Sequence, residues 1–158
     1  KQPYAYSKNC ISKKIKIDAK SINLRLWGCF GPYEDYDKFF SANIMNYVNN
    51  KPIRIYKDRR MDFIHIYDFY KIISFILRTK DKYFLYDVNC VYDEKYKLSE
   101  LAKIINSLDS HKVEILIDKK NEDTSYVGIP SKKINYQLSK IDERIKEHYR
   151  FLKNHYKV

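Results

Sequence analysis

The chain has 158 residues, of which 44% are hydrophobic and 32% are charged. This length fits one domain around a single core, and the composition is that of a globular protein and excludes a disordered one. No apolar run approaches the roughly 18 residues of a membrane span, and residues 1–20 lack the apolar stretch of a signal peptide. We therefore expect a cytoplasmic protein with no membrane partner.

The net charge of +11 comes from 31 Lys and Arg residues against 20 Asp and Glu residues. Such a charge is compatible with nucleic-acid binding, because cations that neutralise phosphates release counterions. The lysines are, however, spread along the whole chain instead of being clustered, so we expect no nucleic-acid partner. A positive field also attracts a small molecule that carries a diphosphate.

The three cysteines, Cys10, Cys29 and Cys90, are far apart and form no CxxC pair. An odd number of distant cysteines predicts neither a disulfide framework nor a zinc site. We therefore expect three buried free thiols and no metal.

Hydrophobic periodicity predicts helices and strands that alternate along the chain. In chain order, the expected elements are a helix at 3–19, a strand at 21–27, a turn-rich loop at 28–32, a helix at 36–49, strands at 53–56 and 62–66, a helix at 68–78, a strand at 84–88, a helix at 100–107 with Ser99 as its N-cap, a strand at 113–117 and a helix at 139–154. Strands separated by helices indicate an α/β fold with at least part of its sheet parallel.

A Tyr-x-x-x-Lys motif opens the chain, with Tyr4 and Lys8 four positions apart. On a helix this spacing places both side chains on one face. A tyrosine hydroxyl titrates near 10, roughly, in water, and a nearby ammonium in a dry site favours the phenolate, so the pair is able to exchange protons near neutral pH. An ordinary amphipathic helix also contains this spacing, and that alternative stays open in a chain with 16 tyrosines.

Three sequence blocks follow one another in a characteristic order: PYAYSK at 3–8, NLRLWGCFGPYED at 23–35 and KPIRIYKDRRMDFIHIYDF at 51–69. With these blocks the chain resembles the second half of the extended short-chain dehydrogenase/reductase family, in its branch of nucleotide-sugar epimerases, dehydratases and reductases. The likeness is clear to about residue 107 and loose afterwards.

The resemblance implies the C-terminal part of a Rossmann-like fold with a small substrate-binding region. Residues 1–35 would form the end of the Rossmann-like domain, with the tyrosine helix and the strand after it. Residues 36–158 would form a mixed substrate-binding region that includes one returning strand of the sheet.

The resemblance also implies roles around an NAD or NADP cofactor. Tyr4 would be the catalytic acid/base at the sugar, and Lys8 would hydrogen-bond the nicotinamide ribose and assist ionisation of the tyrosine. Trp27, Gly28 and Phe30 would lie against the cofactor. Gly28 stands where many members of the family carry Asn, and a glycine cannot supply the contact of that side chain.

A second set of residues would contact a nucleoside-diphosphate sugar. The set consists of Phe30, Lys38, Phe39, Asn43, Arg59, Arg60 and His65. Met61 occupies the position of the family's phosphate-binding arginine, with Arg59 and Arg60 just before it, and either arginine is suited to grip a diphosphate. Asp68 keeps an acidic position at a helix start, where it either caps the helix or serves function. Some members of the family also epimerise their sugar with the help of a histidine. This chain has Ala42 at the position of that histidine.

The sequence has only three glycines and no glycine-rich turn of the kind that cradles a cofactor pyrophosphate. We therefore expect a fragment of a nucleotide-sugar reductase or epimerase of polysaccharide biosynthesis, inactive alone, whose partners are its missing N-terminal half and a second copy in a homodimer. An inactive sugar-nucleotide-binding domain and a basic nucleic-acid-binding domain are the alternatives. Exposed apolar surface at the truncated sheet should make the isolated chain self-associate.

Overall fold

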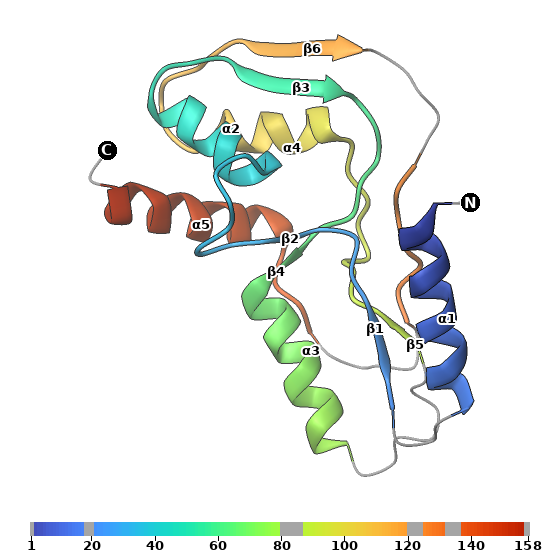
Figure 1. Cartoon of the computed structure of the whole chain (residues 1–158). Helices are drawn as coiled ribbons and strands as arrows, with labels where there is room; N and C mark the ends of the chain where they lie inside the picture. The colour runs from blue at the N-terminus through green and yellow to red at the C-terminus, as the bar shows by residue number, and fades with distance from the viewer. Residues whose placement is uncertain (1, 18–20, 80–86, 120–124, 132–136, 157–158) are drawn as a thin grey trace.

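A computed structural model describes residues 2–17, 21–79, 87–119, 125–131 and 137–156 (Figure 1). The helices are α1 (Pro3–Ile17), α2 (Phe39–Val48), α3 (Ile66–Arg78), α4 (Leu98–Ile105) and α5 (Ile141–Tyr156). The strands are β1 (Asn23–Arg25), β2 (Cys29–Phe30), β3 (Ile53–Lys57), β4 (Ile64–His65), β5 (Asp87–Asn89) and β6 (Ile115–Lys119). Helices and strands alternate, as the α/β prediction requires.

The described strands form three parallel pairs, each joined from distant parts of the sequence. β1 pairs with β5, β2 with β4, and β3 with β6. Parallel neighbours need a crossover connection, and helices supply it here: α2 lies between β2 and β4 in the sequence, and α4 between β3 and β6. The predicted parallel arrangement is therefore confirmed.

The core is built on helices whose apolar residues recur every three or four positions. In α2 the buried residues include Phe40, Ile44 and Tyr47, and α5 buries Ile145, Tyr149 and Leu152, among others. Helix α2 contacts both α5 and β3, so it lies between α5 and the β3–β6 pair. Figure 1 shows β3 and β6 covering α2 and α4, with α5 on the other side of these helices. This body holds one wall of the site described below.

Helix α1 differs from the others because none of its described residues is buried. Its ties to the rest of the molecule are polar: Asn23 Nδ2 donates to Ser12 Oγ at 3.3 Å, and Lys16 Nζ lies 3.7 Å from Asp87 Oδ2. Ile11 and Ile17 stay 52% and 87% exposed. In Figure 1, α1 flanks β1 and β5 along one side.

A buried ion pair fastens α5 to α3. The Asp68 carboxylate is fully buried and accepts two hydrogen bonds from Arg144, each of 2.8 Å, and one from the Tyr92 hydroxyl at 2.7 Å. Lys71 Nζ adds a contact of 3.1 Å. One of the two expected roles of Asp68 was to cap α3, and this was wrong. The N-cap is His65, whose Nδ1 accepts a hydrogen bond from the Tyr67 amide.

The predicted elements all have counterparts, with ends that differ by a few residues. Residues 18–20 of the predicted first helix and 84–86 of the predicted strand lie outside the described residues. The loop expected at 28–32 contains the short strand β2. Two residues are too few to show the alternating pattern that predicts a strand. Ser99 is not an N-cap: α4 begins at Leu98, and the Lys97 amide before it donates to Glu100 Oε2 at 2.6 Å.

The cysteines are free, as expected, but only Cys90 is buried, whereas Cys10 and Cys29 are exposed. The expectation of three buried thiols was wrong because α1 packs no residue into the core and β2 turns Cys29 outward. Among the described helices, none is long and apolar enough to cross a membrane.

Candidate functional site

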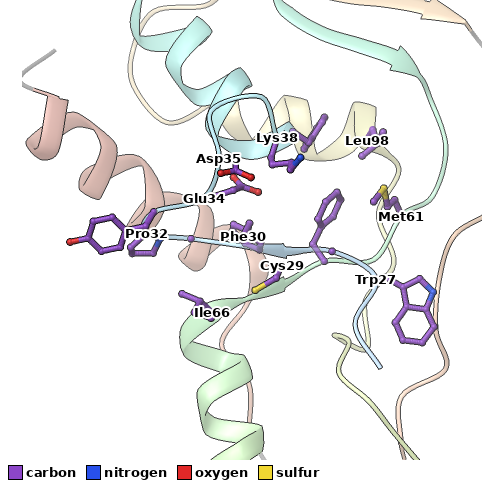
Figure 2. A pocket seen from close by; sticks show the side chains of 15 residues that line it. Trp27, Cys29, Phe30, Pro32, Glu34, Asp35, Lys38, Met61, Ile66 and Leu98 are labelled. Atoms are coloured by element: carbon purple, nitrogen blue, oxygen red, sulfur yellow. The ribbon is translucent and has the colours of Figure 1, made fainter. Parts of the chain in front are cut away.

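A pocket of about 560 Å³ opens where β2 and the loop after it meet the start of α2. Its apolar wall consists of Trp27, Phe30, Pro32, Phe39, Met61, Phe63, Ile66 and Leu98. Its polar side chains come mostly from one loop and are Cys29, Tyr33, Glu34, Asp35 and Lys38. Figure 2 shows this division, with Glu34, Asp35 and Lys38 together on one side and Met61 and Trp27 on the other.

Two glycines let the pocket floor pass close to its neighbours. A β-carbon on residue 28 would lie 2.6 Å from Cδ1 of Phe63, so the Phe63 ring already fills the space of a side chain there. This packing explains physically why Gly28 stands where an Asn would be expected. Gly31 has φ +134°, a conformation that side chains disfavour, and a β-carbon would meet His65 Nε2 at 2.9 Å.

The loop after β2 is held by a buried polar cluster of three side chains from separate elements. Glu34 Oε2 accepts from the Ser41 amide at 3.0 Å and from the Ser41 hydroxyl at 2.7 Å. His148 Nε2 of α5 lies 3.0 Å from the Ser41 oxygen and 3.6 Å from Glu34 Oε2. Glu34 thereby satisfies one amide at the N-terminus of α2, that of Ser41, where a negative charge is favoured.

Lys38 and Phe39 line the pocket, as two of the predicted substrate contacts should. Lys38 is exposed, and its Nζ lies 3.3 Å from Asp37 Oδ1. It is the one lysine or arginine among the lining residues. An anionic ligand in the pocket would therefore meet its nearest positive charge at this end of the loop.

Trp27, Gly28 and Phe30 also line the pocket. The Trp27 ring packs over Gly128, where a β-carbon would approach to 2.4 Å, and edge-on to Tyr126. Phe30 is 1% exposed and stacks on Phe40 with ring centroids 4.0 Å apart. The three residues predicted to face a cofactor thus share one cavity with Lys38.

Tyr4 and Lys8 lie next to each other on α1, as their spacing predicts, but they do not line the pocket. The Lys8 ammonium lies over the Tyr4 ring, 5.3 Å from its centroid. Tyr4 is 73% exposed, so its hydroxyl is open to a ligand or to another chain. Within the described residues, the structure therefore brings the pair together and leaves it on an open surface.

Four other predicted substrate contacts lie outside the pocket lining. Asn43 is 3% exposed, and its amide is used by the backbone: it donates to Phe39 and Arg54 oxygens and accepts from the Arg54 amide at 2.8 Å. The geometry gives Asn43 the structural role of joining α2 to β3.

The arginine pair beside Met61 also lies outside the pocket lining. Arg60 donates to the Lys95 oxygen at 3.2 Å, while the Arg59 guanidinium lies 6.0 Å from the Tyr126 ring centroid. Met61 itself lines the pocket. The residue at the family's arginine position therefore contributes an apolar side chain, and the two arginines lie outside the pocket lining.

His65 is fully buried, and desolvation lowers its pKa to about 4, with the Arg144 charge adding to the effect. The ring is therefore neutral near pH 7. Its Nδ1 accepts a hydrogen bond from the Tyr67 amide, so the proton is on Nε2. Nε2 has no hydrogen-bond partner among the described residues. The Phe30 and Tyr67 rings pack edge-on around it. His65 therefore packs against aromatic rings and caps α3, and it does not line the pocket.

Sequence reasoning missed Glu34, Ser41 and His148. The nearest signal was the acidic pair that follows the Gly-Pro turn, at the start of a predicted helix, which is a favourable place for a carboxylate. His148 gave no signal, because it stands 107 positions from Ser41 in the sequence.

Comparisons with known proteins point to one family. The model of the NAD dependent epimerase/dehydratase family matches residues 1–88. A search of curated proteins finds no match. Among solved structures, UDP-glucuronic acid 4-epimerase from Bacillus cereus, in complex with UDP-glucuronic acid and NAD, superposes with a TM-score of 0.78 at 19% identity, over 98% of this chain and 53% of that one.

Two further structures match in the same way. UDP-N-acetylglucosamine 4-epimerase from Methanobrevibacter ruminantium M1, in complex with UDP-N-acetylmuramic acid, gives a TM-score of 0.76 at 18% identity, over 97% of this chain and 54% of that one. dTDP-glucose 4,6-dehydratase from Bacillus anthracis str. Ames, in complex with NAD, gives 0.73 at 17% identity, over 98% and 53%. At such identities the likeness shows the fold, and the chain spans about half the length of these relatives.

Proposed function

Because the chain belongs to the NAD dependent epimerase/dehydratase family, we propose that it is the substrate-binding half of an NAD- or NADP-dependent enzyme that reduces or epimerises a nucleoside-diphosphate sugar. The observation that carries the proposal is the pocket of about 560 Å³ beside β2. Its volume lies in the range of small-molecule sites, and it combines an apolar wall with a few polar groups. Most of its lining belongs to the segment matched by the family model.

The residues present fit one end of the cofactor. Tyr4 and Lys8 offer a hydroxyl and an ammonium on an open helix face, which suits the nicotinamide ribose. A pyrophosphate cradle needs a glycine-rich turn at a helix N-terminus, and the three glycines of this sequence are Gly28, Gly31 and Gly128. We propose that residues 1–35 join a cofactor-binding half that supplies this cradle, and that residues 36–158 hold the substrate.

The bound nicotinamide would supply the hydride chemistry. This chain would contribute proton transfer: the Tyr4 hydroxyl would give a proton to the developing sugar alkoxide in reduction, and the Tyr4 phenolate would take a proton from the sugar hydroxyl in the reverse direction. The Lys8 ammonium next to the ring favours the phenolate once the pair is covered and dry. Burial of the open α1 face by the other half would provide that environment.

The pocket would orient the sugar nucleotide for this step. Lys38 would meet the diphosphate as a point charge at the loop, and Phe39, Phe63 and Met61 would cover apolar faces of the ligand. Arg59 and Arg60 would add positive charge near the nucleotide. The net charge of +11 would favour the approach of the dianionic diphosphate.

An activity assay tests the proposal. The chain joined to its cofactor-binding half is given nucleoside-diphosphate sugars, and the sugar product is followed by NMR. Tyr4→Phe should lower kcat by about 10²- to 10⁴-fold, the usual range for loss of a general acid/base. Tyr6→Phe is the matched control, because Tyr6 is an exposed tyrosine on the same helix. Equal activity of Tyr4→Phe and Tyr6→Phe would show that Tyr4 is not the proton carrier.

A further inference from the structure

The pocket contains one carboxylate whose position is fixed by its surroundings. The Glu34 side chain is 7% exposed although it lines the cavity. Its Oε2 accepts hydrogen bonds from the Ser41 amide and the Ser41 hydroxyl, at 3.0 and 2.7 Å. The hydrogen bonds to described residues all fall on Oε2, so Oε1 is left for a ligand. Figure 2 shows the Glu34 carboxylate beside Asp35 and below Lys38, within the ring of pocket side chains.

Three features hold the Glu34 side chain in place. The N-terminus of α2 favours a negative charge next to Ser41. Two hydrogen bonds from Ser41 fix the position of Oε2. His148 closes the cluster from α5, with its Nε2 3.6 Å from Glu34 Oε2 and 3.0 Å from the Ser41 oxygen. A carboxylate held in this way cannot swing aside to accommodate a second negative charge.

The opposite wall offers no charge to a ligand. Figure 2 places Trp27, Met61 and Leu98 across the pocket from Glu34, and all three side chains are apolar or aromatic. A neutral sugar ring matches this division, since its hydroxyls donate to a carboxylate and its C–H faces pack on apolar groups. A sugar carboxylate would face Glu34 in a partly dry cavity, where repulsion between like charges is stronger than in water.

We propose that Glu34 determines the sugar class, by accepting a hydrogen bond from a ring hydroxyl of a neutral sugar and excluding uronic acids. Ser41 and His148 act as positioning residues for Glu34. This inference rests on the proposed function, because it assumes that a nucleoside-diphosphate sugar occupies the pocket. It adds the substrate class, which is a neutral sugar.

Binding of matched ligand pairs to the full chain tests the inference by calorimetry. The pairs are UDP-glucose with UDP-glucuronic acid and GDP-mannose with GDP-mannuronic acid, which differ in a hydroxymethyl group against a carboxylate; UDP and GDP serve as references. We expect the neutral member to bind at least tenfold more tightly, on the order of the effect of one charge-assisted hydrogen bond. Equal affinities for the two members of a pair, or tighter binding of the uronic acid, would overturn the inference. The measurement on the wild-type chain is sufficient for this.

Variants then locate the selectivity. Glu34→Gln keeps the size of the side chain and should bring the ratio to within about threefold of unity, with the affinity for UDP or GDP unchanged. Ser41→Ala, which removes one of the two bonds to Oε2, should lower the ratio partly. Asp37→Asn is the matched control: it removes an acid of the same loop that does not line the pocket, and the ratio should stay at the wild-type value.

The outcomes separate this inference from the proposed function. If none of the nucleotides or nucleotide sugars binds, the proposed function fails and this inference fails with it. If they bind and Glu34→Gln keeps the wild-type ratio, the inference alone fails. If Asp37→Asn changes the ratio as much as Glu34→Gln, general electrostatics and not the placement of Glu34 would set it, which also overturns the inference.

Discussion

Replacing Asp68 with asparagine should loosen the attachment of α5 to α3. Asp68 is fully buried and accepts hydrogen bonds from Arg144 and Tyr92. Burial alone would raise the pKa of Asp68, but the hydrogen bonds from Arg144, Tyr92 and Lys71 outweigh it and lower the pKa to about 2. The folded state therefore strongly favours the charged carboxylate, which the neutral amide of an asparagine cannot replace.

The magnitude follows from the pKa difference between the folded and unfolded states. An unfolded Asp titrates near 3.9, so a shift of about two units corresponds to about 2.5 kcal/mol of stability near pH 7. Because the folded pKa is the lower one, this stability is fully present above about pH 4 to 5 and disappears as the pH falls towards 2. Arg144 left without its buried partner adds to the cost, so we expect a loss of about 2–4 kcal/mol.

Urea denaturation at pH 7 and at pH 3 measures this loss. For a chain of this size, the expected loss of unfolding free energy corresponds to a decrease of about 5–15 °C in Tm. The difference in unfolding free energy between wild type and Asp68→Asn should be smaller at pH 3 than at pH 7. Asp142→Asn is the control, since its pair with Lys146 is surface-exposed at 3.9 Å and worth about 0.5 kcal/mol. A loss below about 1 kcal/mol, or one that does not change with pH, would refute the reasoning.

The remaining predictions concern the pocket floor, the pocket thiol and the open helix. Gly31→Ala should destabilise the chain by about 1–3 kcal/mol in urea denaturation, because φ is +134° and the β-carbon would meet Ile66 and His65; an unchanged midpoint would contradict that geometry. Cys29 should react with maleimide more slowly than Cys10, since burial and then Glu34 raise its pKa, and a nucleoside-diphosphate sugar should slow it further while leaving Cys10 unaffected; equal rates with and without ligand would argue against occupancy of the pocket. The open face of α1 should make the chain self-associate in light scattering at micromolar concentrations, and Ile11→Glu with Ile17→Glu should restore the monomer; a wild-type monomer would count against that expectation.

The sequence predicts the parts of the fold that depend on local periodicity. The stripes of α2 and α5 repeat every three or four positions and lie in the core, as expected. The strand β2 has two residues and exists only because β4 pairs with it. Local patterns carry no trace of such a pairing, which explains why a loop was expected there.

The candidate site divides in the same way. Lys38, Phe39 and the residues of the Gly-Pro turn were predicted from a resemblance in contiguous blocks, and they do line one pocket. Asn43 was predicted from the same resemblance, yet its amide joins two backbone segments and lies outside the pocket lining. Glu34 acquires its fixed position only through Ser41 and His148, which the fold brings together from distant positions.

The fluorescence of Trp27 during titration with nucleoside-diphosphate sugars tests the central claim most directly. Trp27 is the only tryptophan of the chain and lines the pocket, so its emission reports ligands at this place. We predict a saturable change with UDP- or GDP-linked sugars, weakened by Lys38→Met, and no saturable change with inorganic phosphate. Absence of any response to these ligands, or a larger response to a single-stranded oligonucleotide that disappears steeply with salt, would contradict the assignment of the pocket to a sugar nucleotide.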